Sequence, residues 1–87
     1  MTKIYAKGSL TLDEVIVQKI HKARMDGKLS FDQREEQKIA DVLRDGLLEK
    51  NDIDSAHLSH LLKHSRYQGH PLLDSEEIKE LVEALDF

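Results

Sequence analysis

The sequence predicts an all-α fold of four short helices, arranged as two packed helix–turn–helix repeats. Three observations support this: four helix-start signals at nearly regular spacing, apolar residues at helical spacing after each signal, and an ungapped internal repeat. A chain of 87 residues fits one domain with a modest core. We therefore expect a single helical domain over residues 1–87, with an N-terminal arm (1–9), a first hairpin (11–49) and a second hairpin (53–87).

Each expected helix follows a residue whose side chain can accept hydrogen bonds from the first free backbone amides. These capping residues recur about every 21 positions, and they are Thr11, Asp32, Asp54 and Asp74. A glutamate stands three positions after Thr11, Asp32 and Asp74, which is the pattern of a capping box. The helix starts are therefore the most specific structural signal in the chain.

Apolar residues recur every three or four positions after each cap, as on the buried face of an amphipathic helix. In contrast, an extended pattern occurs only in residues 3–7, which fits a loose arm. The four expected core faces are Leu12, Val15, Ile16, Ile20 and Ala23; Ile39, Val42, Leu43 and Leu47; Leu58, Leu61 and Leu62; and Ile78, Leu81, Val82 and Leu85.

Residues 22–43 align without a gap with residues 64–85. Each copy has one apolar face that it cannot bury alone, so the two copies should pack together. Unrelated helical hairpins with the same start and stop signals are the alternative explanation of this similarity. The matched pairs include Arg24 and Arg66, Gly27 and Gly69, Asp32 and Asp74, and Glu35 and Glu77.

The first turn, Asp26-Gly27-Lys28-Leu29-Ser30, lies between two amphipathic helices and has a counterpart 42 residues later. In this respect the chain resembles an EF-hand pair, and the turn is also similar to that of TerB-like helical domains from tellurite-resistance systems. The length of the chain fits the EF-hand-like pair better, because the TerB-like domain is longer. The EF-hand resemblance implies a calcium loop, which needs oxygen ligands at loop positions 1, 3, 5 and 12.

The residues at these loop positions do not suit calcium. With Gly27 or Gly69 at loop position 6, only one of the eight ligand positions carries a carboxylate, that of Asp26. We therefore expect an EF-hand-like fold without calcium and without any other cofactor. Arg24 and Arg66 can replace the charge of the ion by bonding loop carbonyls or Asp26, or they are two solvated arginines. The expected loop-ordering residues are Arg24, Asp26, Gly27, Arg66 and Gly69.

Three of the five histidines, His57, His60 and His64, share one stripe of the third expected helix. His60 and His64 have the i, i+4 spacing that can clamp a transition metal, but no acid or cysteine at ligand spacing completes a site. These residues are therefore only weak metal candidates. A pH-responsive face is another hypothesis, because full histidine protonation near pH 6.5 would move the formal charge from −4 to about +1. The third hypothesis is that the histidines form a polar flank of the helix that faces water or a partner.

Several functional classes lack support in the composition. There is no cysteine, no apolar run long enough for a membrane span, and no long apolar region of a secretory signal near the start. We therefore expect a cytoplasmic protein that does not insert into a membrane. The glycines are isolated and the paired glutamates stand at helix starts, so the sequence offers no phosphate loop or catalytic motif, and we expect no enzyme.

The leading functional hypothesis is a small, non-catalytic protein–protein interaction module that regulates or adapts a larger protein. A variant of this hypothesis is a homodimer that forms through the same partner-binding face. The first alternative is a histidine-based metal or pH sensor. The second is nucleic-acid binding through residues 19–28, which the net charge of −4 and the 5% aromatic content disfavour. The expected partner contacts are the apolar residues outside the core faces, namely Val17, Leu48, Tyr67, Leu72 and Phe87, with Tyr5 on the arm.

Overall fold

The computed structural model describes residues 3–85, with only the backbone of Tyr67. This part of the chain is mainly helical, as expected, but the all-α prediction is wrong because short strands form two antiparallel pairs. In chain order, the elements are β1 (Lys3–Tyr5), α1 (Leu12–Met25), α2 (Gln33–Gly46), β2 (Asp52–Asp54), α3 (Ser55–His64), β3 (Arg66–Tyr67), β4 (His70–Pro71) and α4 (Ser75–Ala84).

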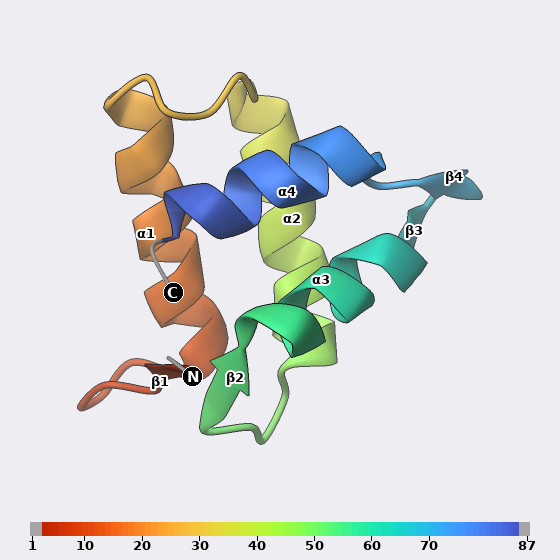
Figure 1. The fold of residues 1–87 in the computed structure, drawn as a ribbon. Coiled ribbons are helices and arrows are strands. Elements are labelled where there is room, and N and C mark those ends of the chain that lie inside the picture. Colours follow the sequence, from red (N-terminus) through yellow and green to blue (C-terminus); the bar gives the residue numbers. More distant parts are fainter. Residues whose placement is uncertain (1–2, 86–87) are drawn as a thin grey trace.

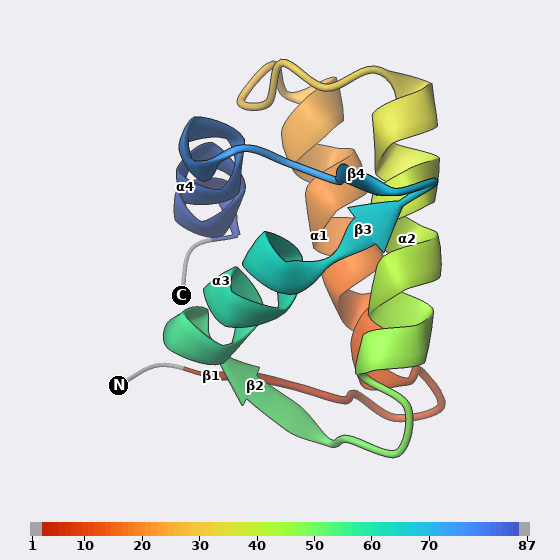
Figure 2. The same cartoon turned by 90° about the vertical axis from the view of Figure 1, so that its right-hand side faces the viewer.

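The helices form two layers. α1 packs beside α2, and α3 packs beside α4. The second pair crosses one side of the first pair (Figure 1), and a view turned by 90° separates the two layers (Figure 2). None of the helices among residues 3–85 is both long and apolar enough to cross a membrane.

One apolar core lies between the two layers and receives side chains from all four helices. All five residues of the first expected face are buried, and no polar or charged side chain of the described residues is buried. Val42, Leu61 and Val82 are only partly buried and pack at the edge of this core. The core residues that lie outside the expected helical faces are Ile4, Leu29, Phe31, Ile53, Leu72 and Leu73.

The four expected helix starts are confirmed: Thr11, Asp32, Asp54 and Asp74 are the N-cap residues. Asp74 forms the complete reciprocal box, in which its side chain accepts from the backbone of Glu77 and the Glu77 side chain accepts from the backbone of Asp74. The expected box at Thr11 is wrong. The Thr11 hydroxyl instead donates to Asp13 (2.6 Å) and Glu14 (3.0 Å), and its oxygen accepts no hydrogen bond from a helix amide.

The N-terminal segment is a strand and not a loose arm. β1 pairs with β2, which places Ile4 opposite Ile53, and both side chains are buried. Successive side chains of a strand point to opposite faces, so a single apolar residue between polar neighbours reaches the core. The amine of Lys3 lies 3.7 Å from a carboxylate oxygen of Asp52 on the neighbouring strand. The segment therefore closes one end of the core.

The turn after α1 is held by buried side chains and by a contact with α4. Gly27 has a φ of +78°, the left-handed conformation that glycine adopts at no steric cost. Leu29 and Phe31 are buried in the core. The backbone amide of Ser30 donates to Oε1 of Glu80 at 3.0 Å. The first turn is thus fixed to the second helical pair.

The turn after α3 has a different geometry, although the sequences of the two turns align. β3 and β4 form a tight hairpin in which Gln68 (φ +53°) and Gly69 (φ +82°) both have positive φ, as a type I′ turn requires. Arg24 lies within α1, whereas its counterpart Arg66 lies in β3. Aligned positions in the two turns therefore do not share local structure.

Gly46, unlike Gly27 and Gly69, does not have a positive φ. It lies within α2, and a Cβ atom built on it would be 2.7 Å from Cδ1 of Leu61. This glycine therefore allows the side chain of Leu61 on α3 to approach the backbone of α2 closely.

We predict that replacing Gln68 by glycine stabilises the fold. Positive φ is costly for a residue with a Cβ atom, so the free energy of unfolding should rise by about 0.5–1 kcal/mol. Gln37, an exposed residue inside α2, provides the matched control, because Gln37→Gly should lower this free energy by about 1 kcal/mol. Urea unfolding followed by circular dichroism measures both changes. Equal destabilisation by the two substitutions would contradict the assigned hairpin.

Candidate partner-binding groove

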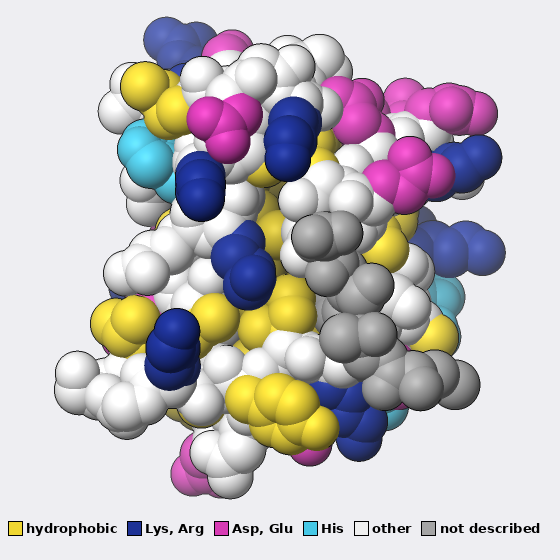
Figure 3. All heavy atoms as spheres, turned by 60° about the vertical axis from the view of Figure 1, so that its left-hand side comes forward, with side chains coloured by type: hydrophobic (Ala, Val, Ile, Leu, Met, Phe, Trp, Pro, Cys, Tyr) yellow, Lys and Arg dark blue, Asp and Glu magenta, His cyan; other side chains and the backbone are white. Residues whose placement is uncertain are grey.

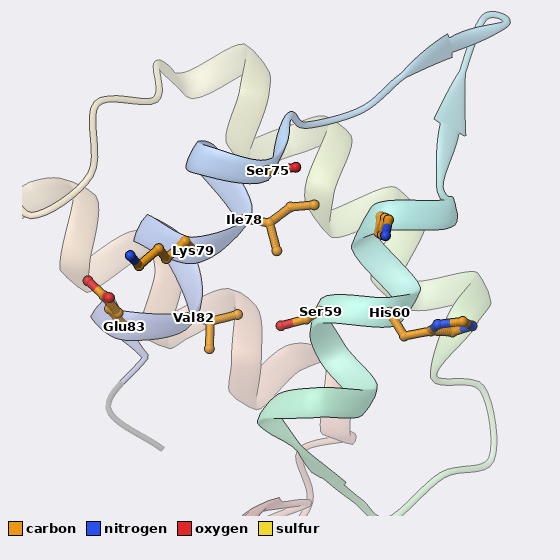
Figure 4. A pocket seen from close by; sticks show the side chains of 8 residues that line it. Ser59, His60, Ser75, Ile78, Lys79, Val82 and Glu83 are labelled. Atoms are coloured by element: carbon orange, nitrogen blue, oxygen red, sulfur yellow. The ribbon is translucent and has the colours of Figure 1, made fainter.

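A groove of about 460 Å³ lies between α3 and α4. Figure 4 shows that Ser59, Ile78 and Val82 point into the space between the two helices, whereas the ring of His60 points outward. The residues that line the groove are Ser59, His60, Lys63, Ser75, Ile78, Lys79, Val82 and Glu83.

The helical repeat explains why these residues share one surface. On α4, positions 75, 78, 79, 82 and 83 follow the i, i+3, i+4, i+7, i+8 pattern of a single helix face. On α3, Ser59 and Lys63 are one turn apart. The floor is apolar, because Ile78 is only 7% exposed and Val82 packs against the edge of the core. The groove thus continues the core to the surface.

Charged residues surround this apolar floor. Lys63 on α3 and Lys79 on α4 are both exposed. Within residues 3–85, neither lysine forms an ion pair. Glu83 lies one helical turn after Lys79 on α4. The groove therefore combines a small apolar surface with cationic groups that are available for contacts with another molecule.

None of the expected partner contacts whose side chains the structure describes lines the groove. Leu72 is a core residue with 8% exposure, so its assignment to the surface is wrong. Val17 is half-buried beside α2, and Leu48 is 72% exposed after the end of α2. The side chain of Tyr67 and all of Phe87 lie outside the described residues.

Sequence reasoning missed the groove because it assigned Val82 to the core face together with Ile78, and Val82 is only partly buried, unlike Ile78. The available signal was the width of the apolar face of α4, which spans Ile78, Leu81, Val82 and Leu85. A face this wide can place one edge outside the contact with neighbouring helices. Lys79 and Glu83 stand directly beside this edge in the helical repeat.

The histidine stripe brings two rings together. The ring centroids of His60 and His64 are 4.3 Å apart, with an interplanar angle of 52°. Nδ1 of His57 lies 3.9 Å from Oδ1 of Asp54, the cap of the same helix. Among residues 3–85, no three metal-ligating side chains come together in a group that could hold an ion. The geometry provides a pair of imidazoles but no closed metal centre.

The basic stretch at residues 19–28 is divided between two sides of α1. Lys19, Lys22 and Lys28 border a small cavity of about 140 Å³ beside the end of α4. His21 and Arg24 face α2 instead. In Figure 3, Lys and Arg side chains lie singly on the face that carries α1, separated by neutral and hydrophobic surface. They do not form the continuous basic stripe that tracks a nucleic-acid backbone.

Arg24 does not bond loop carbonyls or Asp26, so that expectation is wrong. Its Nε donates to Oε2 of Glu36 at 3.0 Å, and Nδ1 of His21 lies 2.9 Å from Oε1 of the same carboxylate. The antiparallel packing of α1 and α2 brings the first turn of α2 beside the last turns of α1. Arg66 is exposed on β3. The described partner of Arg24 thus lies on the neighbouring helix and not in the loop.

Comparisons of this chain with protein families, with curated proteins and with solved structures find no match.

We predict that Arg24→Ala is more destabilising than His21→Ala. The side chains of Arg24 and Glu36 are only 21% and 11% exposed, whereas that of His21 is 56% exposed. Loss of Arg24 leaves a largely buried carboxylate with a weaker partner and should cost about 1–2 kcal/mol. Loss of His21 should cost a few tenths of a kcal/mol. Urea unfolding measures both values, and a larger effect at His21 would contradict this ranking.

Proposed function

We propose that this chain is a small, non-catalytic protein-interaction module of the cytoplasm, which regulates or adapts a larger protein. The observation that carries the proposal is the groove between α3 and α4, whose apolar floor consists of buried Ile78 and partly buried Val82 and lies between charged residues. A surface with an apolar centre and a polar rim is typical of sites where proteins contact each other.

The character of the groove supports a binding role over a catalytic one. Active sites are mostly concave pockets in which a few precisely placed polar groups converge. Here the floor is apolar, the ring of His60 points outward, and Lys63 and Lys79 are exposed. The described polar side chains are also all outside the buried core. This arrangement supports recognition of a partner surface more than chemistry on a bound substrate.

The relation to an ion-free EF-hand pair stays part of this proposal. Two packed helical pairs support it, and Gly27 has the left-handed conformation expected at a sharp turn. The β3–β4 hairpin in the second turn does not follow the geometry of the first turn. The functional proposal does not depend on this relation, because fold alone does not specify function.

The alternative functions have less support. A metal sensor would need a third ligand, and residues 3–85 provide none beside the His60–His64 pair. A nucleic-acid binder would need a continuous basic surface, whereas the lysines of residues 19–28 are separated from His21 and Arg24. A homodimer that uses the groove is a variant of the interaction module.

We predict that Ser59→Trp abolishes partner capture because the indole would fill the groove. The test is affinity capture from the native lysate, with and without a chelator, read by quantitative mass spectrometry. At least one stoichiometric protein should be captured by the wild type and lost by Ser59→Trp, and it should persist in chelator. The matched control is Gln37→Trp, which adds the same side chain at an exposed position of α2, a helix that contributes no residue to the groove.

Thermal melting of the three proteins shows first that each variant folds. Equal capture by the wild type and by Ser59→Trp would contradict the proposed site. Loss of the captured protein in chelator would favour a metal-dependent function and would also overturn the proposal.

A further inference from the structure

We propose that the groove between α3 and α4 binds an amphipathic helix of the partner, and that this helix carries acidic side chains beside its apolar anchors. The inference rests on the proposed function, because it specifies the class of partner for the same groove. The shape of the groove walls, the size of its apolar floor and the charges on each side favour such a helix.

The walls of the groove favour a helix as the occupant. Both walls are helices, whose backbone amides and carbonyls bond within the helix, so no free strand edge is available for an added β-strand. The α4 side extends from Ser75 to Glu83, which is about 12 Å, or two turns, at the rise of an α-helix. Rows of side chains at i, i+3 and i+4 spacing pack well against the corresponding rows of another helix.

The size of the apolar floor limits how many apolar side chains of the partner helix the groove can hold. Ile78 and Val82 are one turn apart on α4, and Ser59 leaves space opposite them on α3. This arrangement suits one or two aliphatic or aromatic side chains at i, i+3 or i, i+4 spacing on the partner helix. So small an apolar surface predicts a weak, reversible complex.

The lysines on the rim of the groove favour acidic residues on the partner helix. The whole chain has a net charge of −4, yet the groove is lined by two lysines, one glutamate and one histidine. Lys63 and Lys79 stand on different helices, so they flank the floor from both sides. Neither forms an ion pair among the described residues. Complementary charges of this kind direct orientation and speed association.

Of the four glutamates of α4, Glu83 lines the groove, whereas Glu76, Glu77 and Glu80 do not. Glu80 accepts from the amide of Ser30, and Glu77 accepts from the amide of Asp74, so these two carboxylates serve other parts of the fold. Glu83 lines the groove one turn beyond Lys79. The partner should therefore place its acidic side chains near Lys63 and Lys79 and a neutral or basic side chain near Glu83.

Selection from a library of helical peptides tests the inference directly. Peptides with randomised exposed positions would be displayed on phage, selected on the wild-type protein, and depleted on Ser59→Trp. We expect enrichment of apolar pairs at i, i+3 or i, i+4 spacing with neighbouring Asp or Glu. The affinity of an enriched peptide should fall at least about tenfold for the variant K63E/K79E, and it should recover when the acids of the peptide are changed to lysine.

The variant K19E/K22E makes the same change of charge outside the groove and should bind the enriched peptide as the wild type does. Enrichment of neutral or basic helices, or unchanged binding by K63E/K79E, would overturn the acidic specificity. Failure to enrich any groove-dependent helix would overturn the helical occupant. The proposed function is tested separately, by affinity capture from the lysate. It stands if the captured protein is lost with Ser59→Trp, and it fails if Ser59→Trp captures the same proteins as the wild type.

Discussion

The two helical pairs share one apolar core, and the packing of the four helices depends on it. Each helix has a single apolar face, and the pairs α1–α2 and α3–α4 bury these faces against each other. Burial of one Leu or Ile side chain contributes about 1.5–3 kcal/mol, so a core of this kind is the main source of stability in a small domain. Without any buried polar side chain among the described residues, shape and apolar burial determine how the helices pack.

Polar contacts fix the geometry at the boundary of this core. Glu36 joins α2 to Arg24 and His21 on α1, and Glu80 joins α4 to the amide of Ser30 in the first turn. α4 is thus held on one side by its core residues and by Glu80, while Lys79 and Glu83 stay available beside the groove. The groove is therefore formed by helices whose positions are already determined, which reduces the entropic cost of binding a partner.

The sequence predicts the local parts of this fold well. Helix starts depend on one capping side chain and its near neighbours, and core faces depend on the helical repeat, so Asp32, Asp54 and Asp74 could be identified from sequence. Thr11 is also the N-cap that the sequence predicts, but it forms no capping box, and its hydroxyl donates to the carboxylates of Asp13 and Glu14.

Features that depend on distant partners could not be predicted in the same way. β1 has only three residues, and it becomes a strand because Ile53, far away in the sequence, pairs with Ile4. The second turn aligns with the first, but positive φ at both Gln68 and Gly69 produces a hairpin there. The groove depends on how α3 and α4 pack in three dimensions, which decides that Val82 stands at the edge of the core and Leu72 lies inside it. Helical periodicity alone does not contain this information.

The most direct test of the central claim is site-specific photocrosslinking in the native cell. A photoreactive phenylalanine derivative would replace Ser59 in the groove, and the same residue at Gln37 on the exposed side of α2 would serve as control. The account predicts a single covalent adduct with a partner protein from position 59 and none from position 37. An adduct from position 37 but not from position 59 would contradict the claim that the α3–α4 groove is where this protein binds its partner.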